Sequence, residues 1–341
     1  MTINRYSFPI FIAISSSLSV CNANAFDSTT TMLKTSTNEL ALSVSGLTNG
    51  PFGPAVESGN PRQIIITNSG KYPTENLFIS LPKWPLGTKI TSNTCPSNLQ
   101  PKSSCQLTIT PGRVASSDGV NPCSIGSSPL PGVIEIGASN SNTIKTRVFV
   151  MDYGCIYQGG YIFAIDDLTS TSTSIGGKVL ATSEQSQALL WGDTLDKFEG
   201  IDENSTSGAN SCNGATDGLC NSRRILASGL KPPAAVKACE QLNDSGFNGW
   251  YLPAICEMGY DTYNHSSHCG SKANPSLQNF TSTLYDNKRA NMPVAEYWSS
   301  TQFSGAPDFA WLHFTLNSGQ DYEFKKFDYQ VRCVRHLSNE K

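Results

Sequence analysis

The chain has few charged residues and no excess of basic ones. Lys, Arg, Asp and Glu make up 15% of its 341 residues, and the formal net charge is −3 at pH 7. General nucleic-acid binding depends on a basic surface that neutralises phosphates, so this composition argues against that class of function. Ser, Thr, Asn and Gly are abundant instead, a balance typical of extracellular proteins rich in strands and loops.

The sequence also lacks the local motifs of common hydrolases. It contains neither a Gly-x-Ser-x-Gly nucleophile elbow nor a His-Glu-x-x-His zinc helix. A catalytic triad is a spatial arrangement that a linear motif need not reveal. A secreted enzyme with an unrecognised active site therefore stays open as an alternative.

No apolar run reaches the length that a bilayer-spanning helix requires. The stretch from Phe8 to Val20 is apolar but short, follows the basic Arg5, and leads to the small-residue segment Ala23-Asn24-Ala25. This pattern predicts a signal peptide over residues 1–25. A lipoprotein anchor at Cys21 is the alternative, which the bulky residue before that cysteine disfavours. We therefore expect a secreted or cell-surface protein, with the periplasm as a further possibility.

Of the 11 cysteines, ten remain once Cys21 is removed with the signal peptide. An even number in an exported chain predicts a disulfide framework. Three pairs would each close a short loop, namely Cys95–Cys105, Cys212–Cys220 and Cys256–Cys269. The other four cysteines are Cys123, Cys155, Cys239 and Cys333, and the count alone does not determine how they pair.

The N-terminal half of the mature chain has the pattern of an all-β domain. Residues 26–38 are polar and rich in Thr and Ser, which predicts a disordered linker. Short β-branched runs separated by turn residues then predict a sandwich over residues 39–152. The runs are Ile64–Ile66, Leu77–Ile79, Leu107–Ile109, Val133–Ile136 and Val148–Val150. The small loop between Cys95 and Cys105, just before a strand, resembles that of bacterial immunoglobulin-like domains, which usually act as spacers or stalks.

Residues 153–338 are richer in aromatic residues and show helical periodicity, which predicts an α+β second domain. A helix is expected over Ala234–Leu242, because Pro232 and Pro233 fit its start and Cys239 falls on its apolar face. Other expected elements are a short helix after Pro253, a helix over Pro275–Tyr285, strands at Phe309–Leu316, Tyr322–Phe324 and Tyr329–Val334, and a loop insertion over residues 201–222.

Three segments occur in order towards the C-terminus: Gly249-Trp250-Tyr251-Leu252-Pro253, Tyr297-Trp298-Ser299-Ser300-Thr301 and Tyr329-Gln330-Val331-Arg332-Cys333-Val334-Arg335. This set resembles the C-terminal domain of the bacterial collagen-like adhesin Lcl, a family of extracellular domains with a fold related to C-type lectins. The resemblance spans residues 155–336. It implies that most of the shared positions determine the fold; they are Cys239, Trp250, Leu252, Pro253, Tyr297, Trp298, Ser299, Ser300, Trp311, Arg332 and Cys333.

The same resemblance implies a disulfide between the first helix and the last strand, Cys239–Cys333. Cys123–Cys155 is then the pair that is left, and it would brace the junction between the domains. The calcium-site tripeptides of sugar-binding C-type lectins, Glu-Pro-Asn and Trp-Asn-Asp, are absent from the sequence. The resemblance therefore does not imply calcium-dependent sugar binding.

The candidate ligand-binding residues are basic or aromatic. Lys325, Lys326, Arg335 and His336 could form a surface for an anionic glycan, and Trp191 could stack on a sugar ring. The competing interpretation is a solvated basic edge that blunts strand pairing. Zinc binding by His265, His268 and the cysteines Cys256 and Cys269 is a weaker hypothesis, because an exported chain oxidises such cysteines.

The sequence thus predicts a multidomain fold, an N-terminal all-β immunoglobulin-like sandwich followed by an α+β C-type-lectin-like domain. The expected function is binding or adhesion to host or environmental glycans or surface proteins. We expect no enzymatic activity, cofactor, metal or nucleic-acid partner. A structural surface protein whose head oligomerises is a further alternative, and the ligand and the oligomeric state are left open.

Overall fold

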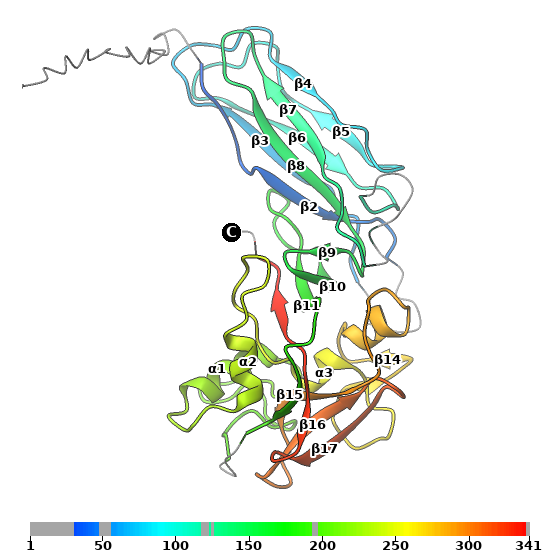
Figure 1. Ribbon diagram of the computed structural model, residues 1–341. Helices are drawn as coiled ribbons and strands as arrows, with labels where there is room; N and C mark the ends of the chain where they lie inside the picture. Colours follow the sequence, from blue (N-terminus) through cyan, green and yellow to red (C-terminus); the bar gives the residue numbers. More distant parts are fainter. Residues whose placement is uncertain (1–30, 48–55, 117–122, 124–125, 193–196, 339–341) are drawn as a thin grey trace, which may run out of the picture.

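The computed structural model describes residues 31–47, 56–116, 123, 126–192 and 197–338 (Figure 1). The predicted signal peptide and Cys21 lie outside these residues. The described chain is mostly β, with several sheets and a few helices confined to its later part. No described helix combines the length and the apolar character needed to cross a membrane.

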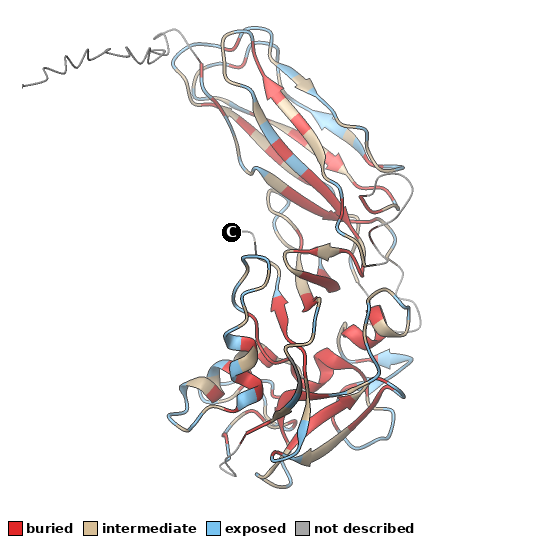
Figure 2. Cartoon of the chain, viewed as in Figure 1, coloured by how far each residue is buried: buried red, intermediate tan, exposed pale blue. Residues whose placement is uncertain are grey.

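Two four-stranded sheets form the N-terminal part, in the orders β1-β3-β6-β5 and β2-β8-β7-β4 (Figure 1). Their strands are β1 (Leu33–Thr35), β2 (Glu39–Ser43), β3 (Arg62–Asn68), β4 (Phe78–Ser80), β5 (Lys89–Asn93), β6 (Ser104–Thr110), β7 (Gly132–Gly137) and β8 (Ile144–Met151). Side chains of β3 alternate between buried and half-buried, as expected when a strand has one face against a core. Ile64 and Ile66 of one sheet share an apolar core with Ile134 and Val148 of the other. Figure 2 shows buried positions along the strands of both sheets.

The strands predicted from the β-branched runs are confirmed, but the linker expected over residues 26–38 is wrong in its later part. Residues 33–35 form β1, which pairs with residues 66–68 of β3. Leu33 is 1% exposed and belongs to the core between the sheets. One buried leucine thus anchors a segment whose composition is otherwise typical of a linker.

The C-terminal part contains two further sheets and short helices. One sheet has the order β19-β11-β10-β9, and the other has the order β12-β18-β15-β16-β17, which places β17 at an edge. The strands are β9 (Ile156–Tyr157), β10 (Gly160–Asp166), β11 (Gly176–Ala181), β12 (Ser186–Leu190), β15 (Glu296–Gln302), β16 (Phe309–Phe314), β17 (Gly319–Phe324), β18 (Asp328–Val331) and β19 (Val334–His336), and a small hairpin joins β13 (Gly270–Ser271) to β14 (Asn274–Pro275).

The helices agree only partly with the sequence. The expected first helix is confirmed as α2 (Ala234–Glu240), and the short one after Pro253 as α3 (Ile255–Met258). The end of the predicted 201–222 loop is instead helical, because α1 (Gly218–Ala227) starts where Asp217 accepts a hydrogen bond from the Cys220 amide at 2.9 Å. The helix expected from residue 275 is a single π turn, η2 (Thr281–Tyr285), since Pro275 belongs to β14.

Five disulfides connect the ten cysteines of the described chain. They are Cys95–Cys105, Cys123–Cys155, Cys212–Cys220, Cys239–Cys333 and Cys256–Cys269, the same pairs that the sequence and the family resemblance led us to expect. Such a density of disulfides is typical of an extracellular protein.

A buried ion pair joins the N-terminal sheets to the C-terminal part. Arg62 Nη2 of β3 lies 2.5 Å from Asp167 Oδ1, just after β10, and both side chains are at most 1% exposed. Arg62 Nη1 also donates to Thr169 Oγ1 and to the carbonyl oxygens of Ser170 and Thr173, each at 2.8 Å. The segment between β10 and β11 is therefore folded around one guanidinium group of the other sheet system.

Candidate functional site

The basic surface predicted from the sequence does not form. Lys325 is fully buried, its ammonium lies 4.6 Å from the centre of the Trp191 ring, and it donates to Gln302 Oε1 at 2.7 Å. Trp191 is also fully buried and donates from its indole nitrogen to the Ser299 carbonyl oxygen at 2.7 Å. Both assignments to a ligand site are therefore wrong for this structure, because the two side chains pack against each other beneath the surface.

The other predicted basic residues are scattered. Arg335 is 4% exposed, and its guanidinium donates to the Gln158 carbonyl oxygen at 2.7 Å and lies over the Phe247 ring at 4.7 Å. His336 is exposed but stacks on the Tyr251 ring, whereas Lys326 is exposed in the turn between β17 and β18. The assignment of Arg335 to a ligand site is therefore also wrong, and the exposed His336 and Lys326 do not form a basic patch with it.

A tightly held loop over residues 261–269, which we call the histidine loop, is the most unusual backbone of the C-terminal part. Asn264, Ser266 and His268 all have left-handed backbone angles, with φ of 59°, 63° and 65°. Residues other than glycine rarely adopt this conformation, and such strain gathers at functional sites.

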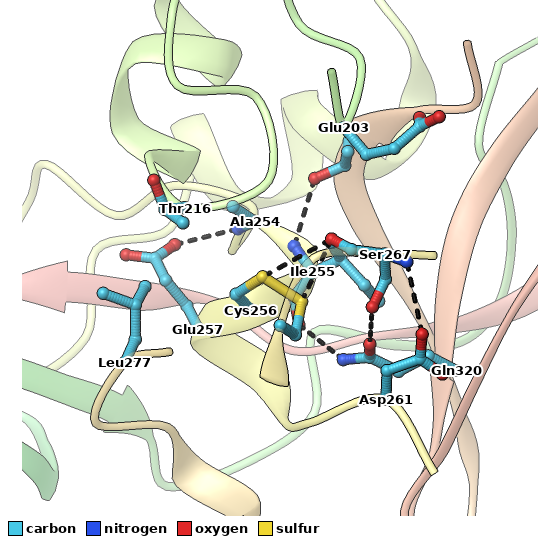
Figure 3. Close-up of a disulfide and its surroundings, with 12 residues drawn as sticks. Glu203, Thr216, Ala254, Ile255, Cys256, Glu257, Asp261, Ser267, Leu277 and Gln320 are labelled. Atoms are coloured by element: carbon cyan, nitrogen blue, oxygen red, sulfur yellow. Dashed lines mark hydrogen bonds between the residues drawn. A yellow bond between two sulfur atoms is a disulfide. The ribbon is translucent and has the colours of Figure 1, made fainter. Parts of the chain in front are cut away.

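The contacts beneath the histidine loop explain how it is held (Figure 3). The Asp261 carboxylate accepts from the backbone amides of His265 at 3.1 Å and Ser267 at 3.3 Å. The Ser267 hydroxyl donates to Gln320 Oε1 of β17 at 2.5 Å. The Cys256–Cys269 disulfide ties the end of the loop to α3. These contacts leave Tyr263, His265 and His268 on the surface.

This arrangement removes the zinc hypothesis. Cys256 and Cys269 are joined to each other and are fully buried, so they offer no thiolates beside His265 and His268. Within the described ranges, no three His, Cys, Asp or Glu side chains are placed to hold a metal ion together.

Beside the histidine loop, seven aromatic rings form a continuous series along β16 and β17, which we call the aromatic row. Its members are Tyr263, His265, Phe303, Phe309, Tyr322, Phe324 and Phe327. The closest pair is Phe303 and Tyr322, whose rings are stacked at 3.7 Å with an interplanar angle of 7°. Tyr263, Phe324 and Phe327 are 45%, 42% and 50% exposed. Phe324 and Phe327 are neighbours at one end of the row and Tyr263 lies at the other, with the half-buried Tyr322 and Phe309 between them. A connected series of rings with exposed ends marks a candidate interaction surface.

The strand register places these rings together. Phe309 lies opposite Phe324, and Trp311 lies opposite Tyr322, so all four side chains share one face of the sheet. Trp311 is fully buried under the row and donates to Glu203 Oε2 at 2.9 Å. The same carboxylate oxygen accepts from the Ser304 amide at 2.9 Å, which fixes the chain that follows Phe303. The row therefore rests on a rigid support.

The free edge of β17 beside the row is partly closed to strand addition. The Tyr322 amide donates to the Asp321 carboxylate at 2.8 Å, and the Phe324 amide donates to the Glu323 carboxylate at 3.3 Å. His265 Nδ1 lies 3.0 Å from the Gln320 carbonyl oxygen. Edge groups that are already bonded, with charges alongside, disfavour pairing with another strand. The rings, rather than the backbone edge, are thus the accessible feature.

The face of the sheet opposite to Phe309, Tyr322 and Phe324 is acidic. Burial raises the pKa of Tyr329 on β18, and the carboxylates of Glu323, Glu296 and Asp321 raise that pKa further. A like-charged neighbour has the same effect on Glu296, whose pKa is raised by burial and by Glu323. At the edge of the sheet, Asp321 and Glu323 flank Tyr322 on β17, and Asp321 Oδ1 lies 3.4 Å from His265 Nδ1. These carboxylates adjoin the row and disfavour a sulfated ligand there.

The rings of the row were missed by the sequence reasoning, although a signal for them exists. The strands expected at Phe309–Leu316 and Tyr322–Phe324 were correct, and period-two alternation places Phe309, Trp311, Tyr322 and Phe324 on shared faces.

One histidine near the site is sealed from solvent. His313 of β16 is fully buried, its Nε2 lies 2.7 Å from Thr281 Oγ1, and any side-chain atom on Gly259 would collide with its ring. Burial lowers the pKa of His313 from 6.5 to about 3. The side chain therefore stays neutral in the fold and has no access to a substrate.

We expect this histidine to make the fold acid-sensitive. Its folded pKa lies below its unfolded pKa, so the unfolded chain binds the extra proton between about pH 6.5 and pH 3. Stability is complete above pH 6.5 and falls by about 1.4 kcal/mol per pH unit below it. Urea unfolding at several pH values should show a shallower loss for His313→Gln; an unchanged slope would contradict this assignment.

Comparisons with known proteins add little to this geometry. No protein-family model matches the chain, and no curated protein matches it. Among solved structures, the secreted serine protease VesC from Vibrio cholerae aligns at 12% identity and a TM-score of 0.21. That alignment covers 42% of this chain and 30% of the protease. So low a score carries no inference about fold or activity.

Proposed function

We propose that the protein is an exported binding protein whose C-terminal part binds neutral carbohydrate through the aromatic row. The observation that carries this proposal is the contiguous series of rings with three well-exposed members, Tyr263, Phe324 and Phe327. Flat apolar faces of sugar rings pack on aromatic side chains, and polar neighbours then bind the hydroxyl groups.

Polar groups suited to hydroxyl recognition lie beside the rings. His268 Nε2 lies 3.0 Å from Asn204 Oδ1, and Asn204 Nδ2 donates to Ser304 Oγ at 2.8 Å. All three side chains are exposed, and Ser304 directly follows Phe303 of the row. A network that is already oriented loses little entropy when a ligand binds.

The finer fold assignment fits the same role. We propose that the two N-terminal sheets are an immunoglobulin-like spacer and that the C-terminal part is a C-type-lectin-like domain similar to that of the Lcl adhesins. The Cys239–Cys333 link between α2 and the segment before β19 supports this, as do the buried Trp250, Trp298 and Trp311. On this proposal the spacer holds the binding domain away from the cell surface.

The test replaces two exposed rings. Phe324→Ala together with Phe327→Ala should weaken binding to a neutral polysaccharide in affinity electrophoresis by about tenfold or more, because exposed aromatic anchors carry much of the energy of such contacts. The fold should persist, since both side chains are about half exposed in the free protein.

The control is Leu86→Ala, which removes an apolar side chain that is 81% exposed in the N-terminal part. Its binding should equal that of the wild type. Equal migration of the wild type and the double ring variant through every neutral polysaccharide gel would count against the proposal.

A further inference from the structure

A pocket of about 430 Å³ lies next to the aromatic row, between the histidine loop, the end of η2 and the turn from β16 to β17. Most of the residues that line it have polar side chains, including Tyr260, Asn264, Lys272, Tyr285 and Asp286, while Leu316 and the tyrosine rings add apolar surface. A volume and a mixed lining of this kind match one small ring that carries polar substituents.

Two of the three charged groups of this pocket, Asp286 and Lys272, are paired within its wall. Asp286 Oδ2 accepts from the Tyr260 hydroxyl at 3.0 Å and lies 3.1 Å from Lys272 Nζ. The Asp261 carboxylate is occupied by the amides of the histidine loop. The lining therefore holds two carboxylates, Asp261 and Asp286, and one ammonium, Lys272, a net negative charge that disfavours an anionic ligand.

Other polar groups of the pocket are available to a ligand. In the part of the chain that the structure describes, the side-chain amide of Asn264 and the hydroxyl groups of Ser271 and Tyr285 are not hydrogen-bonded to the protein. They come from three separate segments, namely the histidine loop, β13 and η2. Donors and acceptors converging from several elements suit a molecule with hydroxyl groups on several sides.

Tyr263 connects the pocket to the aromatic row. Its hydroxyl accepts a hydrogen bond from Asn317, which lines the pocket, while its ring lies 5.7 Å from that of His265 in the row. Its ring also covers Gly319, where any side-chain atom would collide with it. A ligand that fills the pocket can therefore continue onto the row.

We propose that this pocket binds the terminal residue of a neutral carbohydrate chain whose next residues lie on the aromatic row. The inference rests on the proposed function and narrows it to recognition of chain ends. Short oligosaccharides should then occupy both sites, whereas a long polymer with few ends is retained mainly by the row.

The test is the double variant Asn264→Gly and Tyr285→Phe. Glycine accepts the left-handed angle at residue 264, where φ is 59°, and the phenylalanine change removes one hydroxyl only. Titration calorimetry with a neutral oligosaccharide that the wild type binds should show a loss of about tenfold, from two missing hydrogen bonds. Retention by the corresponding long polymer should change by less than about twofold.

The matched control is Asn76→Gly with Tyr72→Phe in the N-terminal part, where φ of Asn76 is 53° and Tyr72 is 45% exposed. Its oligosaccharide affinity should equal that of the wild type. If the pocket variant binds the oligosaccharide with unchanged affinity, the chain-end inference is wrong, while the proposal that the aromatic row binds carbohydrate still stands. A wild type that binds no neutral carbohydrate at all would overturn the proposed function, and this inference with it.

Discussion

Replacing Cys239 and Cys333 together by serine should lower the free energy of unfolding by about 4 to 5 kcal/mol, the largest effect expected from removing any covalent link in this chain. The two cysteines are 94 residues apart, and both are fully buried in the core that also holds Trp250 and Trp298. Without the bond, the unfolded chain regains the freedom that closing so long a loop removes.

Tryptophan fluorescence during guanidinium unfolding reports this loss of unfolding free energy from the C-terminal part, which contains the disulfide. Four of the five tryptophans, Trp191, Trp250, Trp298 and Trp311, belong to the C-terminal part. The matched control is the pair Cys95 and Cys105, which is only 10 residues apart in the N-terminal part. Its removal should cost about 3 kcal/mol and shift the fluorescence transition correspondingly less. Equal shifts for both pairs would contradict the loop-length argument.

Arg62→Ala should lower the free energy of unfolding by about 3 to 5 kcal/mol, because it leaves the buried Asp167 carboxylate without its partner. The same change removes the donor that holds the carbonyl oxygens of Ser170 and Thr173. We therefore also expect the N-terminal and C-terminal parts to unfold in separate steps, which differential scanning calorimetry would resolve as two transitions in place of one.

Two comparisons make this prediction specific. Arg147→Ala breaks an ion pair with Glu39 whose arginine side chain is 50% exposed, so it should cost less than about 1 kcal/mol. Arg62→Met combined with Asp167→Leu removes both charges and should be less destabilising than Arg62→Ala alone. A double variant that is as unstable as Arg62→Ala would show that hydrogen bonds to the loop, rather than the stranded charge, dominate.

Most of the scaffold could be predicted from the sequence because its determinants are local. The β-branched runs gave the strands of the N-terminal sheets, and two prolines gave the start of α2. Leu33 shows where this reasoning stops: apart from Met32 its neighbours are polar, and only pairing with distant β3 makes it part of the core. Asp217 likewise caps α1 inside a segment rich in Asn, Ser and Gly.

The candidate site was harder to predict for a different reason. Lys325 reads as a surface residue, because burying an ammonium is costly unless aromatic rings and acceptors surround it. Those partners, Trp191 and Gln302, lie far away in the sequence and meet it only in the fold. The histidine loop depends in the same way on a single carboxylate, Asp261, that turns its backbone amides inward.

A glycan array that carries both neutral and sulfated glycans, probed with the mature chain and with the Phe324→Ala, Phe327→Ala variant, tests the central claim most directly. The account predicts that the wild type binds neutral glycans, that the variant loses this binding, and that sulfated glycans are not preferred, given the buried Lys325 and Arg335. Selective binding of sulfated glycans, retained in full by the variant, would contradict it.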